Sequence, residues 1–241
     1  MDFYRDIAEW YDRFFPLSPR KVAFFAELLN DRGARTVLDL ACGPGELTRA
    51  LAGEGFRVTG VDATAEFFGI AGGADAGSFA FCAARMEALP FPDDGLFDAV
   101  ICAGNSLPHL DERARIETAI GESARILRPG GIFCVQAIEF AHVRSKGAVA
   151  LPDLRFDQHP CVITLKRIYR VDDEGAAFTP ELVIDDVFAH YRIPMYPLEY
   201  DLLWDMLRAR GFSHAGTYAD FNRIARDENA PSYITIARKD G

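Results

Sequence analysis

Over its first 140 residues the chain alternates short apolar runs with segments whose apolar side chains recur at helical spacing. The apolar runs cover residues 36–40, 56–61, 78–82, 97–103 and 132–138, and each has the length and composition of a buried strand. Strands that alternate with helices are joined by right-handed crossovers, which place the strands in one parallel sheet with helices on both faces. The pattern therefore predicts an α/β fold.

Helix start and stop signals bound the segments between these strands. Ser18 and Pro19 predict the start of one helix and Gly33 predicts its end, and Asp111 is placed to cap another. Each segment carries apolar side chains on one face, as a helix packed on a sheet requires. We expect helices over about 3–15, 18–33, 47–53, 64–71 and 111–128.

After residue 150 the spacing of apolar side chains changes from helical to alternating. Alternation with a period of two, interrupted by the turn residues 172–175, is typical of an antiparallel hairpin or a small antiparallel sheet. A final helix over 197–210 and two strands over 212–218 and 232–238 complete the chain. The second half therefore does not continue the strand–helix alternation of the first.

Charge and cysteine usage narrow the class of function. The chain has 26 basic and 36 acidic residues and a formal net charge of −10, whereas a nucleic-acid-binding surface would need a basic patch. The five cysteines form no CxxC pair, so neither a metal site nor a disulfide framework is indicated. No stretch approaches the roughly 18 apolar residues of a membrane span, and the N-terminus lacks the apolar core of a signal peptide. We expect a cytoplasmic protein without a metal that binds neither nucleic acid nor membrane.

The segment 38–46, LDLACGPGE, joins the first expected strand to the following helix. Glycines at the end of a parallel strand let the backbone approach a ligand, and the next helix presents free N–H groups. The second strand ends at Asp62, where a carboxylate can accept both hydroxyls of a ribose. A dinucleotide fingerprint would have Gly or Ala in place of Thr48. The carboxylate of Asp39 would repel a pyrophosphate but suits an ammonium or sulfonium ligand.

Several segments, in the same order along the chain, resemble the class I S-adenosylmethionine-dependent methyltransferases. LDLACGPGELTRALAGEGFRVTGVDAT is similar to the first two strands of that fold. MEALPF (86–91), FDAVICAGNSLPHL (97–110) and ARILRPGGIF (124–133) are similar to its later segments. The resemblance implies a Rossmann-like sheet of seven strands in the order 3-2-1-4-5-7-6, with the last strand antiparallel. It also implies S-adenosylmethionine as the cofactor and S-adenosylhomocysteine as its product.

Combined with the change of spacing after residue 150, the resemblance predicts a single methyltransferase domain over residues 1–241, with an antiparallel β insertion after strand 5. Within it we expect N-terminal helices or a lid (1–32), a cofactor-binding core (33–140), the β insertion over the acceptor pocket (150–195) and a last helix with strands 6 and 7 (196–241).

The resemblance also assigns residues to the parts of the cofactor. Family members often have an acidic residue at the position of Arg85, where it accepts a hydrogen bond from the adenine amino group. Arginine cannot accept one, so either a backbone carbonyl takes that role or the adenine is held more loosely. The implied cofactor-binding residues are Asp39, Ala41, Gly43 and Gly45 for the methionine moiety, Asp62 for the ribose, Ala63, Arg85 and Met86 for the adenine, and Ala103 and Tyr11 beside them.

The segment GNSLPHL (104–110) is similar to the GNS-x-x-HL segment of glycine and sarcosine N-methyltransferases. By that resemblance Asn105 and His109 are candidate catalytic residues that orient the methyl acceptor, although His109 could equally be a packed loop residue. The glycine enzymes carry an arginine just after the fifth strand to bind the substrate carboxylate, whereas residues 136–140 contain none. We therefore expect a small organic acceptor other than glycine, methylated at nitrogen or oxygen.

Several alternatives stay open at the level of sequence. A nicotinamide-dependent oxidoreductase on a Rossmann fold and a catalytically silent S-adenosylmethionine-binding protein are the alternative functions. The protein could be a monomer or a homodimer. Candidate bases are His109, Glu139 and His142. Candidates for a lid or for the acceptor pocket are Phe3, Tyr4, Trp10, Tyr11, Phe14, Tyr191, Arg192 and Tyr196.

Overall fold

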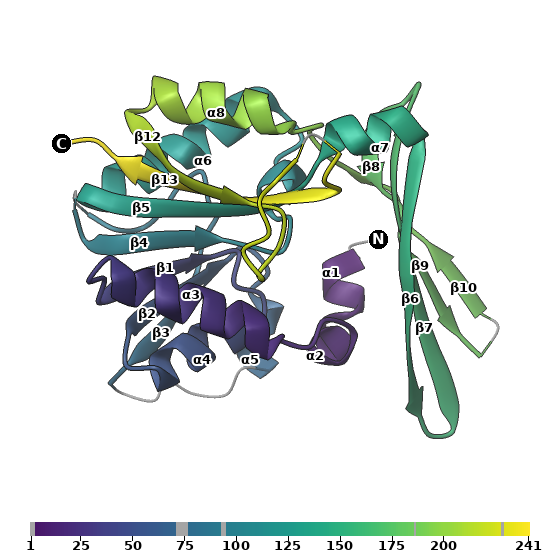
Figure 1. The fold of residues 1–241 in the computed structure, drawn as a ribbon. Coiled ribbons are helices and arrows are strands. Elements are labelled where there is room, and N and C mark those ends of the chain that lie inside the picture. The colour runs from purple at the N-terminus through teal and green to yellow at the C-terminus, as the bar shows by residue number, and fades with distance from the viewer. Residues whose placement is uncertain (1–2, 71–76, 93–94, 186, 228) are drawn as a thin grey trace.

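A twisted sheet of seven strands forms the centre of the larger part of the molecule (Figure 1). The structure is a computed structural model that describes residues 3–70, 77–92, 95–185, 187–227 and 229–241. The strand order is β12-β13-β5-β4-β1-β2-β3, and β13 runs antiparallel to both of its neighbours. This confirms the predicted order 3-2-1-4-5-7-6 with an antiparallel last strand. The strands are β1 (Thr36–Leu40), β2 (Arg57–Asp62), β3 (Phe79–Ala83), β4 (Phe97–Cys102), β5 (Leu127–Ile138), β12 (Phe212–Tyr218) and β13 (Ser232–Lys239).

Helices cover both faces of this sheet, as the strand–helix alternation predicts. Consecutive side chains of β1 point to opposite faces, so Val37 packs with α3 and α4 while Leu38 packs with α6 and α8. Strand β1 pairs with β2 on one side and β4 on the other, and ligands of open α/β sheets bind at such a switch point. The helices are α3 (Pro19–Asp31), α4 (Glu46–Gly53), α5 (Glu66–Ile70), α6 (Arg113–Ile126) and α8 (Tyr200–Ala209).

A second, entirely antiparallel sheet follows β5 and confirms the predicted insertion. It stands at the end of the first sheet in Figure 1. A helix that the sequence reasoning did not expect, α7 (Phe140–Lys146), leads into it. Its strands are β6 (Ala148–Gln158), β7 (Cys161–Asp172), β8 (Gly175–Phe178), β9 (Glu181–Ile184), β10 (Val187–His190) and β11 (Ile193–Pro194).

The N-terminal segment lies between the two sheets (Figure 1), and the single helix expected over 3–15 is wrong. The segment forms three short turns, α1 (Phe3–Asp6), η1 (Ala8–Trp10) and α2 (Tyr11–Phe14). The backbone leaves the helical region at Ile7 and Trp10. Because the chain turns there, Phe3, Ile7 and Phe14 can all be buried against the second sheet, which a straight helix with one apolar stripe would not allow.

Three expected boundaries also differ. Asp111 does not cap α6, because its carboxylate instead accepts a hydrogen bond from Arg115 at 2.6 Å. Helix α8 begins at Tyr200 rather than 197, since the chain stays non-helical around Pro197. The helix expected over 64–71 is found as α5, and its last expected residue lies outside the described residues. Within the part of the chain that the structure describes, every helix is too short or too polar to cross a membrane.

Candidate functional site

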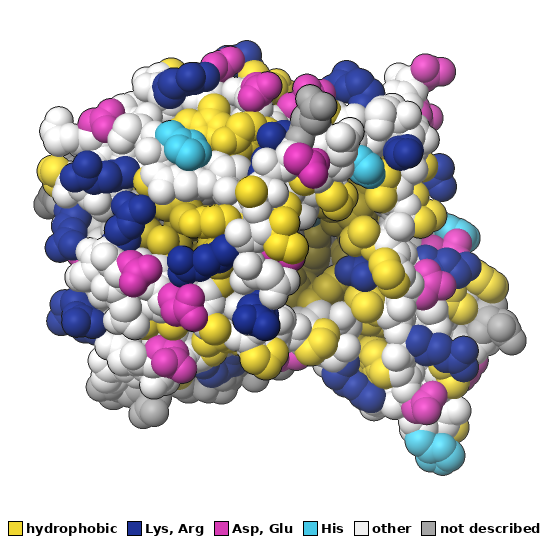
Figure 2. All heavy atoms as spheres, in the orientation of Figure 1, with side chains coloured by type: hydrophobic (Ala, Val, Ile, Leu, Met, Phe, Trp, Pro, Cys, Tyr) yellow, Lys and Arg dark blue, Asp and Glu magenta, His cyan; other side chains and the backbone are white. Residues whose placement is uncertain are grey.

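Two adjoining cavities open where β1, β2 and β4 end, at the switch point of the seven-stranded sheet. The larger has a volume of about 580 Å³ and extends to the second sheet, and the smaller, of about 230 Å³, lies over the end of β2. Figure 2 shows the molecule hollowed between its two parts, with hydrophobic side chains along the hollow. Both cavities share wall residues, namely Tyr4, Tyr11, Ala41, Gly104 and Ser106.

The loop after β1 has the left-handed backbone that its glycines allow. Ala41, Gly43 and Gly45 have φ of 59°, 56° and 86°, and Ala41 and Gly43 line the cavities. Gly45, although it is described, lines neither of these two cavities. A Cβ there would lie 2.3 Å from the ring of Phe81, so this glycine is needed for the loop to pass over Phe81.

Asp39 is buried at the end of β1 and lines the larger cavity. Its Oδ2 accepts a hydrogen bond from the Thr48 hydroxyl at 2.7 Å. Burial raises the pKa of Asp39 to about 6, although Thr48 and Lys21 oppose the shift. The carboxylate is therefore charged at neutral pH and favours a cation in the cavity.

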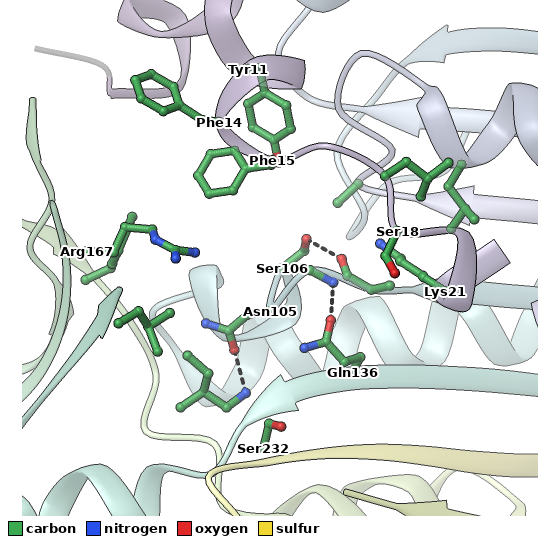
Figure 3. Close-up of a pocket in the computed structure, with 18 of the residues that line it drawn as sticks. Tyr11, Phe14, Phe15, Ser18, Lys21, Asn105, Ser106, Gln136, Arg167 and Ser232 are labelled. Atoms are coloured by element: carbon green, nitrogen blue, oxygen red, sulfur yellow. Dashed lines mark hydrogen bonds between the residues drawn. The ribbon is translucent and has the colours of Figure 1, made fainter. Parts of the chain in front are cut away.

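Lys21, in the first turn of α3, is a cavity residue that the sequence reasoning missed. Its side chain points toward the cavity in Figure 3. Burial lowers the pKa of Lys21, and the carboxylates of Asp39 and Glu46 oppose that shift. A cation in the first turn of a helix is unfavourable for the helix dipole, and that misplaced charge was the available signal in the sequence.

The smaller cavity contains the residues that the resemblance assigns to the adenosine moiety. Asp62, Ala63, Arg85 and Met86 all line it. The Asp62 carboxylate accepts backbone N–H bonds from Gly43 at 2.9 Å and from residue 64 at 2.8 Å. A carboxylate oxygen can accept more than one hydrogen bond, so these bonds leave Asp62 able to accept ribose hydroxyls while it also fixes the loop.

A carboxylate that the sequence reasoning missed lies beside Arg85. The Glu87 side chain accepts hydrogen bonds from Arg85 at 2.8 Å and from Arg115 at 2.9 Å, and it lines the smaller cavity. Burial acts to raise the pKa of Glu87, but the bonds from the two arginines outweigh burial and lower it. An ionised hydrogen-bond acceptor is thus present at Glu87, two residues after Arg85, the position where the family often has an acidic residue.

His109 is hydrogen-bonded to Tyr4, a residue near the N-terminus. Its Nε2 lies 2.9 Å from the hydroxyl of Tyr4, and both side chains line the smaller cavity. Burial lowers the pKa of His109 to about 4. The imidazole is therefore neutral at neutral pH, and its bond to Tyr4 ties the N-terminal segment to the loop after β4.

Asn105 lies on the same loop and faces the larger cavity (Figure 3). Its φ of 63° is left-handed, and its Oδ1 accepts a hydrogen bond from the backbone N–H of Ile138 at 2.9 Å. Its buried Nδ2 has no acceptor within hydrogen-bonding distance among the described residues. Burial raises the pKa of the neighbouring Tyr169, and Asn105 opposes that shift. An unsatisfied buried amide is costly, so a ligand acceptor would suit this position.

The remaining candidates divide between the cavity wall and structural contacts. Ala103 and His142 line the larger cavity, and Tyr11 lines both. Glu139 is not on either of these two walls as described. It caps α7 and accepts a hydrogen bond from Arg226 at 2.8 Å, so its expected role as a base is not supported. Tyr191, which donates to Asp6, and Arg192 and Tyr196 also lie outside the described walls of both cavities.

The far wall of the larger cavity is mostly apolar and comes from the N-terminal segment, the unexpected helix α7 and the second sheet, which is the β insertion expected over the acceptor pocket. Phe15 lies at the end of α2, Val143 on α7, and the rest on the second sheet. Within the described residues, no group of three side chains is arranged to hold a metal ion. The wall residues of the second sheet are Val149, Leu151, Arg167, Tyr169 and Phe178.

Comparisons with known proteins agree with this geometry. A family profile described as "Methyltransferase domain" matches residues 37–131. The glycine/sarcosine/dimethylglycine N-methyltransferase of Actinopolyspora halophila is 27% identical over 99% of this chain, which spans only 41% of that protein. The glycine/sarcosine N-methyltransferase of Aphanothece halophytica is 27% identical over 98% of this chain and 86% of its own length.

Solved structures show the same fold. An S-adenosylmethionine-dependent methyltransferase from Clostridium acetobutylicum superposes with a TM-score of 0.79 at 14% identity, over all of both chains. The CcbJ methyltransferase of Streptomyces caelestis superposes with a TM-score of 0.78 at 20% identity, over 98% of this chain and 96% of that one. These relatives favour S-adenosylmethionine over a nicotinamide cofactor. Together the family profile, the sequence relatives and the shared fold support a class I S-adenosylmethionine-dependent methyltransferase.

Proposed function

We propose that this protein transfers a methyl group from S-adenosylmethionine to a nitrogen atom of a small organic molecule bound in the larger cavity. The observation that carries the proposal is the shared wall of the two cavities. The smaller cavity has the residues suited to adenosine, and the larger one continues from the same loop to an apolar space under the second sheet. The names of the sequence relatives, which are N-methyltransferases of small amines, support the choice of nitrogen.

The residues present fit the cofactor. Asp62 would accept the ribose hydroxyls, and Glu87 would accept the adenine amino group. Asp39 and Lys21 would face the amino and carboxylate groups of the methionine end, since the two side chains carry the opposite charges. When bound, the cofactor supplies a methyl group on a sulfonium sulfur, which is already a good leaving group.

The protein then mainly has to align the two reactants and exclude water. Tyr4 and Tyr11, from the N-terminal segment, lie across both cavities and would cover them. Asn105 would orient the acceptor, and the neutral His109 would hold Tyr4 in place. A neutral amine has a free lone pair and loses its extra proton after transfer, whereas an alcohol needs a base first. His109 is occupied by Tyr4, which favours an amine.

The test is incubation with S-adenosylmethionine that carries a deuterated methyl group and a panel of small amines, followed by mass spectrometry. We expect the label on at least one amine, and thermal stabilisation by S-adenosylhomocysteine but not by NAD. Asp62→Ala, a matched control for cofactor binding, should reduce both signals. Stabilisation without methyl transfer to any small molecule would instead support a catalytically silent binding protein, and label found only on protein or nucleic acid would overturn the acceptor class.

A further inference from the structure

Arg167 is a cation in the larger cavity that has no carboxylate partner among the described residues. It lies on β7 of the second sheet, and its guanidinium points into the open space of the cavity in Figure 3. Among the described residues, none places a carboxylate within 4 Å of it. By contrast, Arg192 and Arg226 each pair with a carboxylate at 2.8 Å. The charge of Arg167 is therefore left for something that enters the cavity.

The surroundings of Arg167 make this unpaired charge costly. Its Nη2 donates to the backbone carbonyl of Pro152 at 2.9 Å, but its Nε is buried with no acceptor among the described residues. The guanidinium lies 5.8 Å from the ring centre of Phe15. Burial lowers the pKa of Arg167, and only Tyr169 and the exposed Asp153 oppose the shift. A half-buried cation in apolar surroundings is stabilised strongly by an anion that pairs with it.

A second donor faces the same space. The Nδ2 of Asn105, which lacks an acceptor among the described residues, points toward the side of the cavity where Arg167 lies (Figure 3). The two donors come from different sheets, one from the loop after β4 and one from β7. Planar guanidinium groups match the two oxygens of a carboxylate, and an amide N–H can supply an additional bond.

We propose that Arg167 binds a carboxylate of the methyl acceptor, assisted by Asn105, so that the acceptor is an amine that also carries a carboxylate and an apolar body. This inference rests on the proposed function. It places the cation on β7, whereas the arginine of the glycine enzymes follows the fifth strand, and it keeps the expectation of an acceptor other than glycine. The apolar body follows from the walls formed by Val149, Leu151 and Phe178.

Arg167→Met removes the cation and keeps a side chain of similar length. Lys166→Met is the matched control, because Lys166 is the neighbouring cation on the same strand, pairs with Glu181 and is not among the described wall residues. Neighbouring side chains of a strand point to opposite faces. Arg167→Lys keeps the charge but loses the guanidinium that bonds Pro152. It therefore separates the effect of losing the charge from the effect of losing that bond.

The readout is methyl transfer to matched pairs in which a carboxylate is replaced by an amide, namely phenylalanine and phenylalaninamide, leucine and leucinamide, and anthranilate and 2-aminobenzamide. For the wild type we expect kcat/KM to favour the carboxylate member by about tenfold to a hundredfold, the range for a charge-assisted hydrogen bond. Arg167→Met should bring that ratio close to one, Arg167→Lys should keep part of it, and Lys166→Met should leave it unchanged. The affinity for S-adenosylhomocysteine should stay the same in all four proteins.

Equal transfer to acids and amides, or a ratio that survives in Arg167→Met, would overturn this inference and leave the proposed function standing. Loss of activity on both members of a pair in Arg167→Met would also overturn it, because that result indicates a structural role. No transfer to any member by a wild type that binds S-adenosylhomocysteine would overturn both the inference and the choice of small amines.

Discussion

The cofactor side and the acceptor side of the site are built by contacts of very different range. On the cofactor side, Asp39 bonds Thr48 across 9 positions of the sequence, and Asp62 bonds Gly43 across 19. The N-terminal segment, which lies between the two sheets and across both cavities, is instead held by distant contacts: Tyr4 meets His109 across 105 positions and Asp6 meets Tyr191 across 185. The first side is a local strand–loop–helix unit, whereas the second exists only after the N-terminal segment and the second sheet have come together.

This difference suggests how one fold can serve many acceptors. The cofactor side depends on backbone conformation and on a few carboxylates, which a short motif specifies. The acceptor side depends on side chains of the second sheet, such as Leu151, Arg167 and Tyr169, which can change without disturbing the glycine loop. We therefore expect cofactor affinity and acceptor selectivity to respond to different substitutions.

The largest effect should come from a buried ion pair at the point where the chain leaves the first sheet for the second. Glu139, 1% exposed at the start of α7, pairs with Arg226 from the segment between β12 and β13. Arg226→Met leaves that carboxylate buried without its partner and should lower the free energy of unfolding by about 3–5 kcal/mol. Urea denaturation measures the loss.

Arg144→Met is the matched control, because it removes an ion pair whose partners are 55% and 37% exposed. Such pairs contribute about 1 kcal/mol or less. Equal losses in the two variants would mean that the buried Glu139–Arg226 pair contributes no more to stability than the exposed pair.

The burial of His109 should make stability depend on pH. His109 has a pKa of about 4 in the folded protein against 6.5 in a free peptide, so between these values the unfolded chain binds a proton that the folded chain does not. The contribution of His109 alone should lower the free energy of unfolding by about 3 kcal/mol as the pH drops through this range.

His109→Gln should not show this part of the pH dependence. Asp39 changes the free energy of unfolding in the opposite direction. Its pKa is raised to about 6 in the folded protein, so the folded protein takes up this proton at a higher pH than the unfolded chain and is stabilised as the pH falls. Asp39 acts in this way in both proteins, so the difference between their denaturation curves isolates His109. If the free energy of unfolding changes equally with pH in the wild type and in His109→Gln between pH 4 and 6.5, the burial of a neutral imidazole is contradicted.

A smaller effect is expected from the glycine loop. Gly45→Ala adds a Cβ at 2.3 Å from Phe81 on a left-handed backbone and should cost about 2–3 kcal/mol. Gly33→Ala has the same kind of backbone but open space around it, and it should cost only about 1 kcal/mol. Urea denaturation of both variants measures the difference. Equal losses of stability would show that the Phe81 ring moves aside without an energetic penalty.

The same contrast explains how much could be predicted from the sequence. The parallel part of the sheet, the glycine loop and the position of Asp62 follow from local spacing, whereas the order of the seven strands followed from the family resemblance. The structure places Asp39, Ala41, Asp62, Ala63 and Met86 around the cavities. Gly45 lies outside the described walls of these two cavities, and the motif alone shows that a glycine is needed there but not whether a ligand or Phe81 requires it.

The individual side chains of the acceptor side could not be predicted from local spacing. Arg167 occupies a strand position whose partner residues are distant in sequence, and nothing in its neighbours distinguishes it from Arg170 on the same strand. Phe15 follows a segment that the amphipathic pattern predicts as one helix, and only packing against a second sheet breaks that helix into turns. Contacts across 100 or more positions leave no local pattern to detect.

The affinity for S-adenosylhomocysteine shows whether the two sides bind different ligands. Asp62→Ala should weaken binding in isothermal titration about tenfold to a hundredfold, because the ribose loses a charged acceptor and the loop loses its anchor. Leu151→Trp, which blocks the far wall of the larger cavity at β6 and leaves Asp39 and Lys21 in place, should keep that affinity within about twofold while abolishing methyl transfer. Comparable loss of affinity in both variants, or in Leu151→Trp alone, would contradict the division of the site into a cofactor side and an acceptor side.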